Sequence, residues 1–182
     1  MKITKTKISD LIIIEPKVFS DSRGYFFEPY NKKLFQKNFC LINFVQDNES
    51  KSSRGVLRGF HFQKPPFDQA KLVRCIEGEV LDIALDLRKE SKTYGEYEKV
   101  ILNGENKKQF FIPRGFAHAF LVLSETAIIS YKVDNVYAPD HDCGVIWSDP
   151  SLSIDWGINK TDLIISNKDK NLDFLSNLKS PF

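Results

Sequence analysis

The sequence predicts an all-β protein that folds as a jelly-roll β-barrel with a few short helices. Its apolar runs are short and bounded by Gly, Pro, Asn or Ser, which is typical of sandwiches and barrels. Fifteen Phe and six Tyr add aromatic side chains, which suit the pleated surface of a sheet. Because the 182 residues contain no repeat, low-complexity tract or linker, we expect a single domain over 1–182.

The expected strands follow the positions of these runs. In chain order they are 11–15, 24–30, 42–48, 55–62, 71–77, 79–87, 97–102, 109–112, 117–123 and 126–133. The run 79–87 is the clearest, because apolar residues alternate there with Asp82 and Asp86 at a period of two.

Turns and helices take up the remainder. Glu77 and Gly78 stand between two strand-like runs and predict a hairpin turn. The segment 31–39 is the best helical candidate, and 170–178 is expected to form another short helix. Helix is therefore a minor part of the chain.

Composition excludes several classes of protein. A net charge of only +2, with both signs interleaved, argues against a nucleic-acid partner. No run approaches eighteen apolar residues, and the apolar stretch at 11–14 is too short for a signal peptide, so we expect no membrane association and a cytoplasmic location. Cys40, Cys75 and Cys143 are too widely spaced for a CxxC site and are expected to be reduced, mostly structural thiols.

Ionisable residues are densest in the stretch 52–78. In a barrel, alternate residues of each strand face the interior, so His61 and Lys71 can point into one pocket and support acid–base chemistry beside a carbonyl. Arg58 has the wrong parity to join His61 in a regular strand, but Gly59 between them fits a β-bulge that resets the alternation. The same stretch fits equally well a solvated edge strand with scattered charges.

The stretch 112–120 contains the pattern Pro-x-Gly-x-x-His, which resembles the second motif of the cupin superfamily. The first cupin motif usually supplies a His-x-His pair to a metal, but here the second His is replaced by Gln63. With three His in the whole chain, a set of three or four metal ligands is not expected. His118 fits either a core histidine with a satisfied ring or a donor to a substrate.

Other polar residues occur in four further stretches. Each stretch alone is also explained by turn or surface chemistry, or by a buried Tyr that needs a hydrogen-bond partner. The residues concerned are Arg23 and Glu28 in 19–31, Gln46 and Asn48 in 44–50, Tyr131 and Tyr137 in 129–150, and Lys168 and Asp169 in 165–169.

Taken together, the chain strongly resembles the dTDP-4-dehydrorhamnose 3,5-epimerase family of the dTDP-L-rhamnose pathway. The matching text, in the order of the family, is DSRGYFFEPY, QDNESKSSRGVLRGFHFQKPP, QAKLVRCIEGEVLDIALDLRKESKTYG, IPRGFAHAFLVLSETAIISYKV, YAP, WSDPSLSIDW and ISNKD. No single piece is decisive, but the ordered set is very specific. It implies a cupin-like homodimer that uses no metal or other cofactor.

The resemblance also implies catalytic roles. His61 is expected to be the general base, oriented by Asp169, and Tyr131 the acid on the opposite face of the sugar. Lys71 is expected to bind the substrate and to stabilise the oxyanion at C4. These residue types suit the reaction, because a proton beside a ketone becomes acidic only when the enolate oxygen is stabilised.

Substrate-binding residues are likewise implied by the family. Those expected to hold the nucleotide and the sugar are Arg23, Glu28, Gln46, Asn48, Arg58, His118 and Lys168, with Tyr137 stacked near the thymine. Asp142 stands where the family usually has a Glu that binds the substrate, and its side chain is one methylene shorter. Phe60 stands where the family often has Leu.

The implied activity is inversion of C3 and C5 of dTDP-4-dehydro-6-deoxy-D-glucose to give dTDP-4-dehydro-L-rhamnose. The nearest alternatives are relatives that epimerise only C3 or only C5, or that act on another 4-keto sugar nucleotide, because the same base and acid serve all of them. A sugar-nucleotide ketoisomerase matches the ordered motifs less well. A non-catalytic cupin that only binds a nucleotide sugar would not need the base, acid and lysine together, and a metal-dependent cupin oxygenase would need the missing His.

Overall fold

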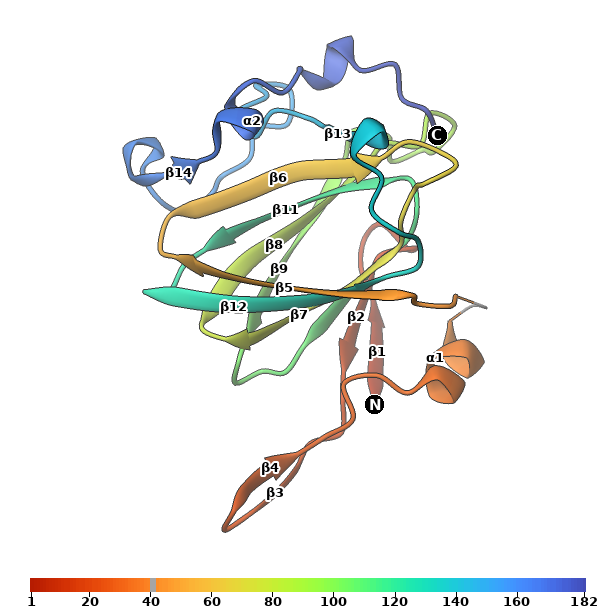
Figure 1. Ribbon diagram of the computed structural model, residues 1–182, viewed down its shortest axis with the longest axis vertical. Helices are drawn as coiled ribbons and strands as arrows, with labels where there is room; N and C mark the ends of the chain where they lie inside the picture. Colours follow the sequence, from red (N-terminus) through yellow and green to blue (C-terminus); the bar gives the residue numbers. More distant parts are fainter. Residues whose placement is uncertain (40–41) are drawn as a thin grey trace.

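The computed structural model describes residues 1–39 and 42–182 and consists mainly of two sheets that face one another (Figure 1). The first sheet has the order β1 (Lys2–Lys5), β2 (Ile12–Glu15), β10 (Gln109–Ile112), β7 (Lys71–Glu77), β12 (Thr126–Val133) and β5 (Gln46–Ser53). The second has the order β13 (Asp142–Gly144), β6 (Val56–Gln63), β11 (Phe116–Val122), β8 (Glu79–Asp86) and β9 (Tyr97–Asn103), with β14 (Ile164–Ile165) parallel to β6. The all-β prediction is confirmed, and the sheets form a jelly-roll-like sandwich of the cupin type.

Several short elements lie outside the two large sheets. A two-stranded arm, β3 (Phe19–Asp21) and β4 (Gly24–Phe26), projects beyond both sheets in Figure 1. The helices are α1 (Lys32–Asn38) and α2 (Asn167–Lys170), with 3-10 turns η1 (Pro139–His141), η2 (Lys160–Asp162) and η3 (Leu175–Asn177). The helix expected at 31–39 is confirmed, and the Asn31 side chain caps it by accepting from the Leu34 N–H at 3.2 Å. The helix expected at 170–178 is wrong, since that segment holds only the end of α2 and the turn η3.

Both faces of the second sheet are buried. Its inner face packs against the first sheet through a cluster that includes Val73, Val80, Ala84 and Phe120. Its outer face is covered by the C-terminal segment, with Trp156 among the buried residues. Each such large side chain contributes roughly 1.5–3 kcal/mol when removed from water. A third cluster lies outside the first sheet, where α1 covers β2, β7 and β10.

Most expected strands are confirmed to within one or two residues, and the exceptions have physical causes. Residues 46–53 form β5, although the expected strand covered only 42–48. Among the described residues this strand lies at a sheet edge and pairs only with β12, and all eight of its side chains are polar, so it carries no apolar signal. Of the expected strand 24–30 only three residues pair, and Pro29, which lacks an N–H, lies in the unpaired part.

The turn at Glu77 and Gly78 is confirmed as a turn, but the hairpin is wrong. β7 and β8 belong to different sheets, so the chain crosses the sandwich at this point. Gly78 has φ +78°, and a Cβ there would lie 2.1 Å from the Thr126 carbonyl oxygen. The turn dipeptide therefore predicts where the chain changes direction. Which strands β7 and β8 pair with depends on packing between residues far apart in the sequence.

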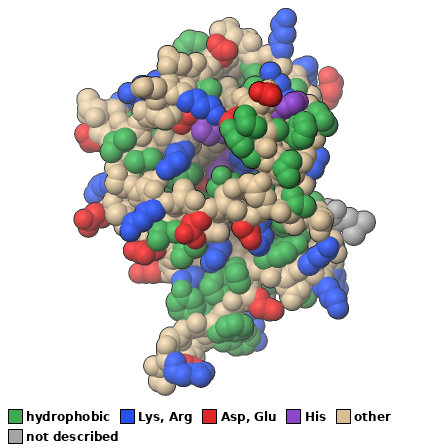
Figure 2. Space-filling view, in the orientation of Figure 1, with side chains coloured by type: hydrophobic (Ala, Val, Ile, Leu, Met, Phe, Trp, Pro, Cys, Tyr) green, Lys and Arg blue, Asp and Glu red, His purple; other side chains and the backbone are tan. Residues whose placement is uncertain are grey.

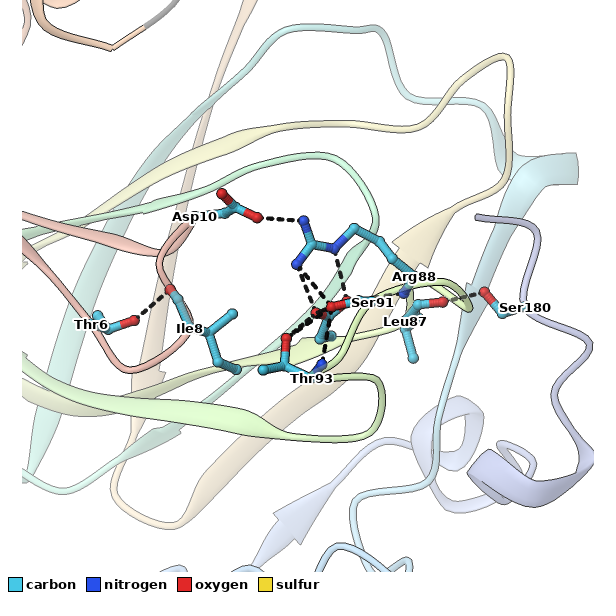
Figure 3. A network of polar contacts seen from close by, with 9 residues as sticks. Thr6, Ile8, Asp10, Leu87, Arg88, Ser91, Thr93 and Ser180 are labelled. Atoms are coloured by element: carbon cyan, nitrogen blue, oxygen red, sulfur yellow. Dashed lines mark hydrogen bonds and ion pairs between the residues drawn. The ribbon is translucent and has the colours of Figure 1, made fainter.

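The acidic face of β8 is buried, although alternation in a strand usually indicates one solvated face. Asp82 and Asp86 are both 0% exposed. Asp86 is neutralised by Arg88, whose Nε and Nη2 donate to its two carboxylate oxygens at 2.9 and 2.7 Å (Figure 3). Ser91 and Thr93 also donate to Asp86, and the Ser180 hydroxyl donates to the Leu87 carbonyl, which ties the C-terminal segment to the same loop.

Neither the described cysteines nor the described helices show a disulfide or a membrane span. Cys75 and Cys143 are free thiols, as expected, and Cys40 lies outside the described residues. Within the described ranges, no helix has the length and apolar character needed to cross a membrane.

Candidate active site

A cavity of about 140 Å³ opens where the two sheets meet near β13. Figure 2 shows histidine side chains within a hollow on this face of the molecule. The lining residues are Gln46, Asn48, His61, Phe62, Gln63, Gln69, Lys71, Tyr131, Tyr137 and Asp142. Pockets for drug-sized ligands usually measure about 300–1,000 Å³, so this cavity suits one sugar ring better than a whole nucleotide sugar.

His61 forms a dyad with Asp169, which is 108 residues away along the chain. The His61 Nε2 lies 2.8 Å from the Asp169 Oδ1, and the Gly59 N–H donates to Oδ2 at 3.2 Å. Asp169 belongs to α2, which begins at the Ser166 cap and packs against β6. Although burial opposes ionisation, the hydrogen bonds from His61 and Gly59 hold the pKa of Asp169 below its usual value. The carboxylate therefore accepts a hydrogen bond from the Nε2–H of His61, which leaves Nδ1 as the basic atom.

Lys71 and Tyr131 come from the first sheet, opposite His61. Lys71 is partly buried at the cavity wall, and burial lowers its pKa to about 8 even though the carboxylates of Asp82 and Asp142 raise it. Burial also raises the pKa of Tyr131, against the opposing effect of Arg58. At neutral pH the first sheet thus presents a mostly charged ammonium and a protonated phenol opposite the His61 ring.

The β-bulge expected at Gly59 is confirmed. His118 pairs with His61 and Phe120 pairs with Arg58, so β6 carries one more residue than β11 over this interval. Leu57 and Phe60 consequently both pack in the outer cluster, which a regular strand forbids for residues three apart. The bulge resolves the parity of Arg58, which is exposed but lies on the same face of β6 as His61, where it donates to the Ser52 hydroxyl of β5 at 3.1 Å.

Polar side chains continue from the cavity to its rim. Gln46 donates to Asn48 at 2.8 Å on the edge strand β5. At the opposite rim, Asp142 accepts a hydrogen bond from the Tyr137 hydroxyl at 3.1 Å and forms an ion pair with Lys168. The hydrogen bond to Asp142 raises the pKa of Tyr137. The short Asp142 side chain therefore joins the loop that carries Tyr137 to the helix that carries Lys168.

Arg23 and Glu28 are not brought to this cavity by their own chain. Arg23 sits at the tip of the arm and forms a fork with Asp21, with Nη2 2.6 Å from Oδ2. Glu28 lines a separate hollow between the base of the arm and α1. Three aromatic side chains of the arm are exposed: Phe19 by 53%, Tyr25 by 58% and Phe26 by 67%.

His118 is buried, as is Asp169 among the other sequence-predicted residues. Its ring is buried, and Nε2 lies 2.9 and 3.0 Å from the two carboxylate oxygens of Asp82. Burial lowers the pKa of His118 by more than Asp82 raises it. Sequence reasoning did not select Asp82 for the site. The available signal was that the residues two positions to either side, Val80 and Ala84, are apolar, which indicates that this face of the strand is buried.

Gln63 and Gln69 also line the cavity and were not selected from the sequence. Gln63 replaces the second His of the cupin metal motif and is 4% exposed. Its Nε2 donates to the carbonyls of Phe67 and Val136 at 2.6 and 3.1 Å, and its Oε1 accepts from the Ala138 N–H at 2.7 Å. In the described part of the chain, no group of three or more His, Cys, Asp or Glu is placed to hold a metal ion.

Comparison with known proteins connects this geometry to one family. A family model described as dTDP-4-dehydrorhamnose 3,5-epimerase matches residues 5–177. A protein of that name from Methanothermobacter thermautotrophicus is 53% identical over 171 residues, which is 93% of this chain and 92% of the relative. A crystal structure from Elizabethkingia anophelis, also of that name, aligns with a TM-score of 0.94 at 53% identity, covering 99% of this chain and 98% of that one. An epimerase structure from Legionella pneumophila, in complex with dTDP-4-keto-L-rhamnose, aligns with a TM-score of 0.94 at 43% identity and covers 98% and 94% of the two chains.

Proposed function

The chain belongs to the dTDP-4-dehydrorhamnose 3,5-epimerase family, and we propose that it inverts C3 and C5 of dTDP-4-dehydro-6-deoxy-D-glucose at the cavity around His61. One observation carries the assignment of roles. A histidine of the second sheet, paired with an aspartate of α2, faces a protonated tyrosine and a partly buried lysine on the first sheet. This arrangement supplies a base, an acid and an oxyanion partner around one small ligand.

In the proposed reaction, Nδ1 of His61 removes the proton on the carbon beside the ketone. The electron pair of the C–H bond moves to the C4 oxygen, and the Lys71 ammonium stabilises the resulting enolate. The Tyr131 hydroxyl then delivers a proton to the same carbon from the opposite face, which inverts it. The imidazolium returns its proton to solvent and the phenolate takes one up, so the same groups serve the second carbon.

Substrate binding is assigned to the residues around and beyond the cavity. Gln46, Asn48 and Arg58 lie beside the acid and are proposed to hold the sugar and the diphosphate, with His118 below them. Tyr137 is proposed to stack against the thymine, since its ring is 57% exposed at the rim. Asp142 and Lys168 are proposed to close this rim over the nucleotide.

Assembly is part of the same proposal. The arm exposes an apolar patch and carries Arg23 and Glu28 away from the cavity of its own chain. A homodimer in which each arm packs on the other copy would bury the patch and bring these side chains to the neighbouring site. The interface should exceed about 1,000 Å². The free thiols fit a reducing compartment, which favours a cytoplasmic location.

The test follows deuterium incorporation by proton NMR, with dTDP-4-keto-6-deoxyglucose in deuterated water. The wild-type protein should introduce deuterium at both C3 and C5. Incorporation at only one carbon would contradict the proposal and indicate a single-carbon epimerase.

Two variants assign the steps. His61→Asn should lose both exchange and inversion by on the order of 10²–10⁴-fold, because abstraction needs the base. Tyr131→Phe should keep exchange while inversion stops, because only the return of the proton on the opposite face is lost. Exchange that survives in His61→Asn but disappears in Tyr131→Phe would show that the two roles are reversed.

A further inference from the structure

Two buried ionisable side chains, Asp82 and His118, lie beneath the cavity and have no step in the mechanism above. The neighbours of Asp82 at two residues either side, Val80 and Ala84, both belong to the cluster between the sheets. Val73, two residues after Lys71, belongs to the same cluster. Because side chains alternate along a strand, Asp82 and Lys71 project into the same interior from opposite sheets.

We propose that Asp82 is a positioning residue for the reaction, a buried counter-ion that keeps the Lys71 ammonium charged and at the same time fixes the ring of His118. The inference rests on the role of Lys71 proposed above. It adds to that role the reason why a partly buried lysine carries the charge that enolate formation needs.

The contact with His118 fixes one tautomer. A carboxylate only accepts hydrogen bonds, so the Nε2 atom, 2.9 and 3.0 Å from the oxygens of Asp82, must carry a proton. In a neutral ring Nδ1 then has none. His118 therefore accepts a hydrogen bond from a sugar hydroxyl and does not donate to the ketone, which leaves Lys71 as the donor to the C4 oxygen.

Charge balance around Lys71 supports the same role. Removing an ammonium from water favours its neutral form, and a nearby carboxylate opposes this. Burial is the largest influence on the pKa of Lys71 and lowers it to about 8, while Asp82 is the first of the groups that raise it. The titratable groups that share this interior or the cavity with Lys71 are Asp82 on β8, Asp142 on β13, His118 on β11, His61 on β6, Tyr131 on β12 and Tyr137 on the following loop.

The chain offers a matched control on the same strand. Asp86 is as buried as Asp82, but its charge is balanced by Arg88, Ser91 and Thr93 in the network of Figure 3. Asp86→Asn therefore removes a buried carboxylate of β8 without touching the surroundings of Lys71.

The experiment measures kcat/KM for proton exchange against pH in the wild type, Asp82→Asn, Asp82→Glu and Asp86→Asn. Loss of the Asp82 charge favours neutral Lys71, so the alkaline limb of Asp82→Asn should move to lower pH by about one unit or more. The variant should then lose about four-fold more activity at pH 8 than at pH 6.5, as follows from a one-unit shift. Asp82→Glu should restore the limb, and Asp86→Asn should leave its position unchanged. A uniform loss at every pH in Asp82→Asn, together with an unchanged Lys71 pKa, would overturn the inference.

A titration separates this inference from the role of Lys71 in catalysis. Lysine labelled with ¹³C at the ε position is followed by NMR, and the Lys71 signal is identified by its absence in Lys71→Arg. A lower Lys71 pKa in Asp82→Asn supports the role of Asp82 as a counter-ion, whether or not the exchange profile moves. If the Lys71 pKa falls but the exchange profile stays unchanged, Lys71 has no role in the mechanism. Wild-type protein alone suffices where the Asn variant does not fold, because a Lys71 pKa of about 5–6, usual for a buried lysine without a counter-ion, would exclude the role of Asp82.

Discussion

At the scale of single residues, the chemistry of the site depends on which atoms donate and which accept. Both partners of the Asp169 carboxylate are donors: the Nε2–H of His61 and the backbone N–H of Gly59. An aspartate satisfies both because each oxygen accepts one bond. The carboxylate thereby holds the imidazole in the tautomer whose free lone pair is on Nδ1.

We expect Asp169→Asn to reduce exchange by on the order of 10²-fold or more, because an amide has only one oxygen for these two donors. When the oxygen accepts from Gly59, the amide NH₂ faces His61 and moves the ring proton to Nδ1, which removes the base. The loss is measured as the rate of deuterium exchange at saturating substrate, and KM should change little.

The control is Asp149→Asn, a buried carboxylate that accepts from the N–H groups of Ser151 and Leu175 and lies outside the cavity lining. It should affect the free energy of unfolding and leave exchange close to the wild-type rate. Equal activity in Asp169→Asn and the wild type would show that the dyad does not orient the base.

At this scale the sequence predicts residue types better than their partners. The alternation of strands brings His61 and Lys71 to one cavity, as expected from the residues alone. The partnership of His61 with Asp169 spans 108 positions and was available only from the family resemblance. Asp82 was missed because an acidic residue on an alternating strand usually indicates a solvated face, and here both faces of the strand are covered.

At the scale of elements, the site depends on the irregularity in β6. The bulge places Arg58 and His61 on the same face of the strand, and Gly59 at its centre has φ +114°. A Cβ at this position would lie 2.4 Å from the His118 carbonyl oxygen and 2.7 Å from the Cα of Ala119. Backbone atoms of a central strand cannot move aside as a flexible side chain does.

Gly59→Ala should therefore lower the free energy of unfolding by roughly 3 kcal/mol, the combined order of backbone strain and overpacking. It should also reduce exchange, because the Gly59 N–H that binds Asp169 shifts with the bulge. Urea unfolding and the exchange assay measure the two effects. Gly157→Ala is the matched control, since Gly157 also has positive φ, +74°, but has nothing within 4 Å of the added Cβ. Equal unfolding energies for the two variants would contradict the steric account.

Elements with an apolar period were predictable, and elements defined by their partners were not. The expected limits of β10 and β12 agree with the structure at both ends, since each strand is read from its own residues. β13 and β14 have three and two residues and exist only because β6 lies beside them. The hairpin expected after β7 was wrong for the same reason, because its two strands found partners in different sheets.

At the scale of the whole molecule, the cavity and the arm divide the expected binding residues between them. The cavity holds the base, the acid and the lysine, whereas Arg23 lies on the exposed arm, in contact with Asp21. The tip of the arm touches the body through Lys107, whose ammonium lies 4.0 Å from the centroid of the Tyr25 ring. The family resemblance implies that both groups bind one substrate, but one chain does not bring them together.

A mixing experiment distinguishes a site shared between two chains from a site built by one. Arg23→Ala has an intact base and lacks the arm guanidinium, and His61→Asn has an intact arm and lacks the base. In a mixed dimer in which each arm reaches the cavity of the other copy, the cavity of the Arg23→Ala chain has its own His61 and the intact arm of its partner. The cavity of the His61→Asn chain lacks both the base and the arm guanidinium. Random pairing makes half of the dimers mixed, so refolding the two variants together should restore about a quarter of the wild-type activity.

The control mixture is His61→Asn with Tyr131→Phe, two residues that line the same cavity of one chain. Each site of such a mixed dimer lacks one of them, so no inversion should be regained. Sedimentation at micromolar concentration should show dimers in both mixtures, which excludes a difference in assembly as the cause. Activity of the first mixture equal to the average of its two separate variants would mean that the arm serves its own chain or none. A monomer in sedimentation would exclude crossed arms altogether, because no second copy would then be present to carry Arg23 to the cavity.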